Sequence, residues 1–222
     1  MDKSCGFIHA EIIAEPLANI VKKILILNFL FIFSFLNAQT SDQESYKTEF
    51  DSILHKRIYR VEYGSIHTIE LVEFKERTFK GRLVNKLTRY NRKSSKDFIQ
   101  KISIPALLTQ KLMNDFKALR IEELKGCGNI FSPEYNCVGA LDGDGTRITV
   151  LSEIMNKKLA FQAISPGNKE TKGYPKNQIV AQKILNVINR EINLKKLLHQ
   201  YMKHLPPGTY GYYGINMIEL KR

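Results

Sequence analysis

A strongly basic segment is the most distinctive chemical feature of this sequence. Residues 75–101 carry ten lysine or arginine side chains against only Glu76 and Asp97, a local net charge of +8 in a chain of net charge +12. Long-range attraction could draw a polyanion to such a surface, for instance lipopolysaccharide phosphates or an acidic polysaccharide. The alternative is a solvated face that keeps a basic protein soluble. The candidate anion-binding residues lie on or beside one predicted strand: Lys80, Arg82, Lys86, Arg89, Arg92 and Lys93.

A pair of cysteines is the second feature. Cys127 and Cys137 lie in the segment GCGNIFSPEYNCVG, which is rich in turn-forming residues. With nine residues between the sulfurs, a local disulfide closes easily, and an oxidising compartment favours it. A redox or metal-binding pair is the competing interpretation, but CxxC spacing is absent and no histidine lies between His67 and His199. We therefore predict a structural disulfide and no metal site.

Recognisable catalytic motifs are missing from the sequence. It contains no GxSxG, SxxK, HExxH, P-loop or GxGxxG pattern. His199 and His204 are five residues apart on a predicted helix, so they point to different sides, and His67 could meet Asp51 only through the fold. We assign no catalytic residue and no cofactor, and we find no nucleic-acid recognition motif.

Two short motifs have plain structural interpretations. The DGDG at 142–145 is similar to part of a calcium loop, but Arg147 stands where that loop requires glycine, so we predict a hairpin turn. Tyr210, Tyr212 and Tyr213 could stack on sugars. We favour an edge strand with packing tyrosines.

The apolar segment KKILILNFLFIFSFLNAQ, residues 22–39, has the features of a secretory signal. Two lysines precede thirteen largely apolar residues, Ile24 to Leu36, and a small-residue exit predicts cleavage after Ala38. As a helix this run spans about 20 Å, against about 30 Å of bilayer hydrocarbon. No stable membrane span is therefore expected after processing. A buried core helix and an uncleaved anchor are the alternatives. Residues 1–20 are unlike a signal's n-region, and we interpret them as a start-site artefact, with translation beginning at Val21.

The NAQ signal, the Cys-x9-Cys loop and the following LDGDGTRITV resemble small exported proteins of Gram-negative bacteria. This resemblance covers only the signal and the region around the cysteines. It implies a periplasmic or secreted location and brings no activity with it. Removal of residues 1–38 would also remove Cys5 and leave an even pair of cysteines, in agreement with export.

Residue periodicity predicts the elements of the mature chain. A flexible polar lead-in is expected at 39–56. Period-two patterns predict strands at 57–63, 67–74, 78–90, 146–152 and 157–164, and a short final strand in 209–222. Helical spacing predicts helices at 103–120 and 177–204, and a polar break is expected at 91–97.

The order of these elements predicts one α+β domain over residues 57–222. It has two layers: an antiparallel sheet, made of a meander and a hairpin, packed by two helices and closed locally by one disulfide. In the third strand, Leu83 and Leu87 share one face while Lys80, Arg82 and Lys86 share the other.

These features favour an exported binding or structural protein without catalysis. An anionic polymer or an envelope component is the expected partner of the basic strand face. A hydrolase acting on cell-envelope or extracellular polymers is the alternative. The sequence leaves the oligomeric state open.

Overall fold

The computed structural model describes residues 47–92, 94–128, 136–139, 145–168, 173–211 and 216–221, all within the unit Gln39–Arg222. The predicted signal peptide, the start at Val21 and the first part of the lead-in, 39–46, lie outside the described residues. None of the described helices is long and apolar enough to cross a bilayer.

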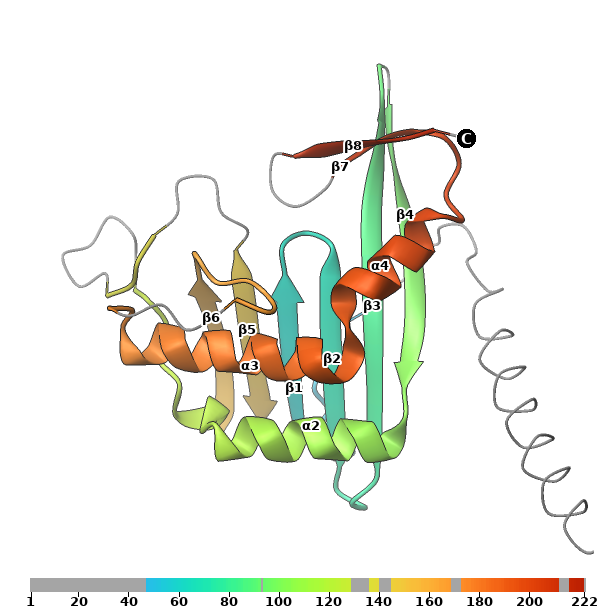
Figure 1. Ribbon diagram of the computed structural model, residues 1–222. Helices are drawn as coiled ribbons and strands as arrows, with labels where there is room; N and C mark the ends of the chain where they lie inside the picture. Colours follow the sequence, from blue (N-terminus) through green and yellow to red (C-terminus); the bar gives the residue numbers. More distant parts are fainter. Residues whose placement is uncertain are drawn as a thin grey trace, which may run out of the picture. The chain divides into compact units, whose positions relative to one another are not determined.

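The described chain forms one antiparallel sheet of eight strands (Figure 1). The strands are β1 (His55–Tyr63), β2 (His67–Phe74), β3 (Phe79–Asn91), β4 (Ser94–Ile104), β5 (Thr146–Ser152), β6 (Met155–Phe161), β7 (Gly208–Gly211) and β8 (Met217–Leu220). Their order is β6-β5-β1-β2-β3, and β3 then pairs with β4 along one edge and with the β7–β8 hairpin near its end.

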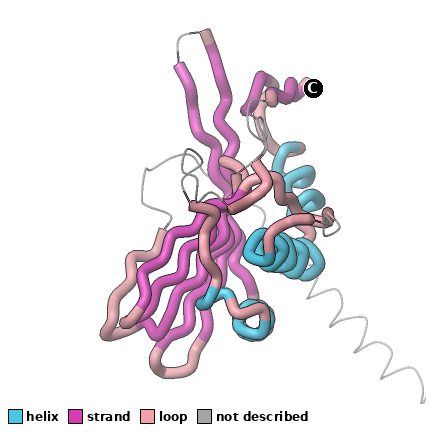
Figure 2. The backbone as a smooth tube through the Cα atoms, turned by 90° about the vertical axis from the view of Figure 1, so that its left-hand side faces the viewer, coloured by secondary structure: helices cyan, strands magenta, loops and turns pink. Residues whose placement is uncertain are grey.

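The helices lie on one face of this sheet (Figure 2). They are α2 (Ala106–Ala118), α3 (Lys176–Ile192), α4 (Leu194–Met202) and the 3-10 helix η1 (Ile121–Glu123). Pro105 and Pro175 directly precede α2 and α3, where a missing backbone N–H costs nothing. The predicted α+β class, two layers with an antiparallel sheet, is confirmed.

The core lies between the sheet and the helices because both present apolar side chains there. The strands contribute Tyr59, Val61, Ile69, Leu71, Leu83, Ile148 and Val150, and the helices contribute Leu112, Phe116, Ile184, Leu185 and Ile188. A second, smaller cluster contains Ile66, Leu87, Leu198, Tyr201 and Tyr210. Alternation in β3 follows the prediction, because Leu83 and Leu87 face these cores.

Strand β4 occupies part of the segment that was expected to be a polar break. Its first residues, Ser94 to Asp97, pair with Thr88 to Asn91 of β3, so the two strands form one long hairpin. This part of the hairpin extends beyond the neighbouring strands (Figure 1). The side chains in this part are largely exposed or half-buried, so no alternation of apolar residues is needed there. The sequence therefore shows no period-two pattern that would predict a strand.

The predicted helix at 177–204 is two helices that meet at Asn193. This residue adopts the left-handed conformation with φ 51°, which asparagine tolerates better than most residues. Its backbone N–H donates to the Asn189 carbonyl and closes α3, while its side chain accepts a hydrogen bond of 3.1 Å from the Lys196 N–H and opens α4. A single residue therefore ends one helix and begins the next.

The predicted disulfide between Cys127 and Cys137 is present, with Cα atoms 5.2 Å apart. Cys127 is buried in the main core, and its carbonyl accepts a hydrogen bond from the Asn136 N–H at 3.0 Å. For a loop this short, the chain-entropy model gives a stabilisation of roughly 2.5–3 kcal/mol. The bridge therefore attaches Cys137 to a buried residue of the main core.

Gly81 allows the first turn of α2 to approach β3. A Cβ atom at this position would overlap Thr109 Oγ1 and lie 3.0 Å from Ile104 Cβ. We expect Gly81→Ala to lower the free energy of unfolding by about 1–3 kcal/mol, because Thr109 is fully buried and its hydroxyl is bonded to the Pro105 carbonyl at 3.1 Å. Urea denaturation measures this. Gly145→Ala is the control, since no atom lies within 4 Å of its added Cβ. Equal effects of the two substitutions would contradict the proposed close packing.

Candidate binding face

A row of polar side chains crosses the sheet on the face opposite to the helices, which we call the outer face. Strand register aligns one residue from each of six neighbouring strands: Lys158, Thr149, Arg60, Glu70, Arg82 and Ser103. At about 4.8 Å between strands, the row is roughly 24 Å long. Because it brings four charged side chains onto one line across the sheet, the row is the candidate site.

The centre of the row is a buried carboxylate held by two arginines. The Glu70 side chain is only 1% exposed. Arg60 donates to Glu70 Oε2 through Nε at 2.8 Å and Nη2 at 2.5 Å, and Arg82 Nη2 lies 2.7 Å from Glu70 Oε1. Such a buried group requires both partners, because an unpaired charge there would cost several kcal/mol.

Residues 47–50, which we call the strap, lie over this cluster. The Thr48 hydroxyl donates to Glu70 Oε1 at 2.6 Å and its backbone N–H donates to Oε2 at 3.1 Å, while its carbonyl accepts from Arg60 Nη2 at 2.7 Å. Phe50 lies beside the His55 ring, with centroids 6.1 Å apart. The strap is thus attached to the sheet, although its residues belong to the lead-in that was expected to be flexible. Strand β1 begins at His55, two residues before the expected domain start at 57.

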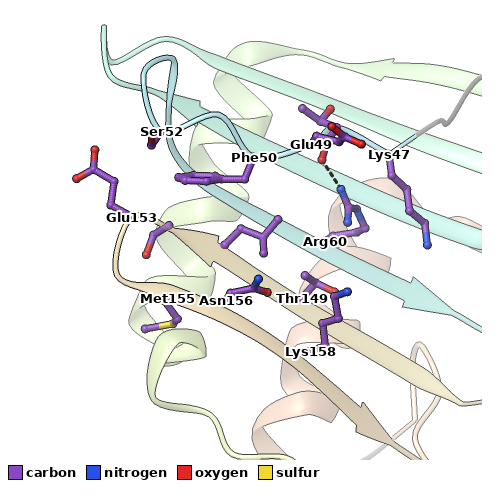
Figure 3. Close-up of a pocket in the computed structure, with 13 residues that line it drawn as sticks. Lys47, Glu49, Phe50, Ser52, Arg60, Thr149, Glu153, Met155, Asn156 and Lys158 are labelled. Carbon is purple, nitrogen blue, oxygen red and sulfur yellow. Dashed lines mark hydrogen bonds between the residues drawn. The ribbon is translucent and has the colours of Figure 1, made fainter.

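A groove of about 820 Å³ lies between the strap and strands β5 and β6 (Figure 3). Its lining combines hydroxyl, amide, charged and apolar side chains. These include Lys47, Glu49, Phe50, Ser52, Arg60, Thr149, Leu151, Glu153, Met155, Asn156 and Lys158.

Ion pairs use most of the charges in this groove. Lys47 and Arg60 pair with Glu62 and Glu70, and Glu153 pairs with Lys75. Burial opposes ionisation of Glu62, but Lys47 and Arg147 outweigh burial and hold the pKa of Glu62 below its usual value. Among the described residues that line the groove, Lys158 and Glu49 form no ion pair, so these two charges remain for a ligand.

The structure divides the predicted anion-binding residues between two faces. Lys80, Arg82 and Lys86 lie on the outer face, as the alternation of β3 requires. Arg89, at an odd position of the same strand, lies on the helix side. It is beside Gly208, where an added Cβ atom would overlap the Arg89 Nε. Arg92 is exposed in the β3–β4 turn, and Lys93 lies outside the described residues.

Two of the outer-face residues are also engaged in ion pairs. Arg82 is bound to Glu70, and Lys86 Nζ lies 2.7 Å from Asp97 Oδ2. Burial opposes ionisation of Asp97, but Lys86 and Thr88 hold its pKa below the usual value. Lys80 is exposed and forms no ion pair with the described residues.

Lys101 is an outer-face cation that sequence reasoning did not select. It is exposed and pairs in register with Val84, between the β3 positions of Arg82 and Lys86. Because β4 was not predicted, nothing assigned a face to this lysine. Phe98, Gln100 and Ile102 lie at every second position and share the face opposite to Lys101. This spacing was the signal that could have assigned Lys101 to the outer face.

The histidines and other predicted motifs do not form a catalytic arrangement in the described chain. His67 is buried and bonds to Asn85, at the end of β2 remote from the turn that contains Asp51. Among the described residues, no cluster of three histidine, cysteine or acidic side chains could hold a metal ion. DGDG is described only at Gly145, so its predicted turn lies outside the described residues. Tyr210 is fully buried against Phe98, as the packing interpretation expects, and Tyr212 and Tyr213 are not described.

Comparison of the chain with protein-family models, curated protein sequences and solved structures gives no significant match. No activity can therefore be transferred from a relative, and the proposed function must rest on the site itself.

Proposed function

We propose that this chain is an exported, non-catalytic binding protein whose outer face holds an anionic polymer such as an acidic polysaccharide. The observation that carries the proposal is the charge of that face. By register, the described strands present four acidic side chains there, Glu62, Glu70, Asp97 and Glu219, against seven basic ones: Arg60, Lys80, Arg82, Lys86, Lys101, Arg147 and Lys158. The excess of three positive charges attracts a polyanion.

Three lysines are the proposed contacts. Lys80, Lys101 and Lys158 are exposed and, among the described residues, form no ion pair. They belong to β3, β4 and β6, so they lie on both sides of the strap. A ligand that reaches all of them must be extended, which favours a polymer over a small anion.

Export is part of the same proposal. The disulfide is the state expected of a cysteine pair in an oxidising compartment, and the signal-like segment at 22–39 provides the route. We infer that the protein works in the periplasm or outside the cell. The hydrolase alternative has less support, because the Nδ1 atom of His67 bonds to an amide oxygen, that of Asn85.

Reversal of the three lysines tests the binding face. We expect Lys80→Glu/Lys101→Glu/Lys158→Glu to bind heparin about tenfold more weakly, because three exposed charge contacts of about 0.5 kcal/mol each are lost. The measurements are the salt concentration that elutes the protein from a heparin column and titration with heparin fragments.

A matched variant tests whether the change in net charge alone explains the weaker heparin binding. Lys176→Glu/Lys195→Glu/Lys196→Glu makes the same charge change at exposed positions in the first turns of α3 and α4. It should elute close to the wild type. Equal losses in both variants would mean that heparin senses only net charge, and would overturn the proposed face.

A further inference from the structure

A second hollow lies far from the strap in the sequence, beside the C-terminal strands. We call it the C-terminal groove. Its volume is about 400 Å³, and it is bounded by α4, the turn that follows α4 and strand β8. The described lining residues are His199, Met202, Lys203, Leu205, Pro207, Ile218, Leu220 and Lys221. Its volume is within the range of about 300–1,000 Å³ that is usual for small-molecule sites.

The floor of the C-terminal groove is apolar for a reason visible in the fold. Met202, Leu205, Ile218 and Leu220 pack inward against the second core cluster, yet each remains half-buried. In β8 the alternation of exposed and half-buried residues directs Ile218 and Leu220 to this side. The outward parts of these four side chains therefore supply the apolar lining of the groove.

The rim of the same groove is basic. Three of its eight described lining residues, His199, Lys203 and Lys221, carry basic side chains, and none of the eight is acidic. The nearest ion pair joins Lys221 to Glu219 at 3.4 Å, with both side chains well exposed. Such a pair is weak and does not occupy the lysine.

We propose that the C-terminal groove binds a single-chain amphiphile with an anionic head, either a carboxylate or a phosphate. The alkyl chain would cover the apolar floor, and the head would lie between Lys203, Lys221 and His199. Each methylene removed from water improves binding by a factor of about four. The basic rim then selects an anionic head over an uncharged one.

This inference does not depend on the proposed function. The C-terminal groove shares no lining residue with the groove beside the strap, and none of the three lysines proposed for the polymer lies in it. The failure of one proposal therefore leaves the other in place.

Calorimetric titration of the full chain at pH 7.5 tests the ligand class. The probes are decanoate, laurate, dodecyl phosphate and the uncharged dodecyl maltoside, each below its micelle concentration. We expect laurate to bind about fifteenfold more tightly than decanoate, because it has two more methylenes. Dodecyl maltoside should bind at least about tenfold more weakly than laurate. The ratio between laurate and dodecyl phosphate identifies the preferred head.

Two variants locate the binding site. Ile218→Asp places a carboxylate on the apolar floor and should abolish laurate binding. Lys203→Glu/Lys221→Glu leaves the floor intact and should weaken laurate binding about tenfold. Lys195→Glu/Lys196→Glu, at the opposite end of α4, is the matched control and should bind laurate like the wild type. Circular dichroism and thermal unfolding establish that each variant is folded.

Three results would overturn the proposal. The first is no heat of binding for laurate or dodecyl phosphate with the wild type. The second is equal affinity for dodecyl maltoside and laurate, which would remove the role of the basic rim. The third is unchanged laurate affinity in the folded Lys203→Glu/Lys221→Glu variant.

Discussion

Replacement of Glu70 by glutamine is expected to lower the free energy of unfolding by about 3–5 kcal/mol. Glutamine has nearly the same shape, so the substitution removes the charge while it leaves packing almost unchanged. Arg60 and Arg82 would then be held beside a neutral amide. Since a small protein has only about 5–15 kcal/mol of total stability, this is a large loss.

The expected loss follows from the number of bonds that end on this one carboxylate. Both arginines and two groups of Thr48 donate to its oxygens. In Glu70→Gln one oxygen becomes an NH₂ group, which cannot accept a hydrogen bond and repels the arginine or hydroxyl that faces it. The strap should therefore loosen together with the centre of the row.

Urea denaturation at pH 7 gives the change in stability, and hydrogen exchange at the Thr48 amide reports on the strap. The control is Glu123→Gln, because the Arg120–Glu123 pair is well exposed on both sides and should contribute less than about 0.5 kcal/mol. A loss below about 1 kcal/mol in Glu70→Gln would place the cluster among ordinary surface ion pairs. Unchanged exchange at Thr48 would mean that the strap is held by other contacts.

The general architecture was predictable from local patterns. The alternation of β1, β2 and β3, the turns between them and the helical spacing around Leu112 and Phe116 all act over a few residues. The disulfide followed from two cysteines in a turn-rich loop. In each case the cause lies within a window of about ten residues, which is the range over which a single sequence is informative.

The centre of the candidate site was not predictable in this way. Thr48 and Glu70 are 22 residues apart, and in the sequence Glu70 is only one of several charged residues at alternating strand positions. Its burial depends on Arg60 and Arg82 arriving on adjacent strands in one register, together with the strap above them. Strand pairing creates that row, so periodicity within one strand cannot reveal it.

The second large effect concerns pH and a buried histidine. His67 is 1% exposed, and burial lowers its pKa to about 4 from an ordinary value of 6.5, although the hydrogen bond to Asn85 acts in the opposite direction. Its Nδ1 lies 2.8 Å from Asn85 Oδ1, and Asn85 Nδ2 donates to Gln100 Oε1 at 2.8 Å. Because Oδ1 must then accept, the neutral ring carries its proton on Nδ1.

The direction of the pH effect follows from which state takes up the proton first. Well above pH 6.5 the ring is neutral in both states and adds no pH dependence. Between pH 6.5 and about 4, His67 binds a proton in the unfolded chain but stays neutral in the folded protein. The free energy of unfolding therefore falls as the pH falls. The total is about 3 kcal/mol, from about 1.4 kcal/mol for each unit of pKa difference. Glu62, Glu73 and Asp97, whose pKa values lie below the ordinary 4.5 or 3.8, begin to lower stability only as the pH falls to those ordinary values.

Urea denaturation between pH 7 and 4.5, compared between the wild type and His67→Gln, therefore isolates the effect of His67. We expect the wild type to lose at least about 2 kcal/mol over this interval and His67→Gln to lose much less, because glutamine does not titrate. His199→Gln is the control, since it removes a histidine that is exposed on α4. Equal slopes for the wild type and His67→Gln would show that other groups cause the pH dependence. A direct measurement of the His67 pKa by NMR near 6.5 would contradict the buried, neutral imidazole on which the prediction depends.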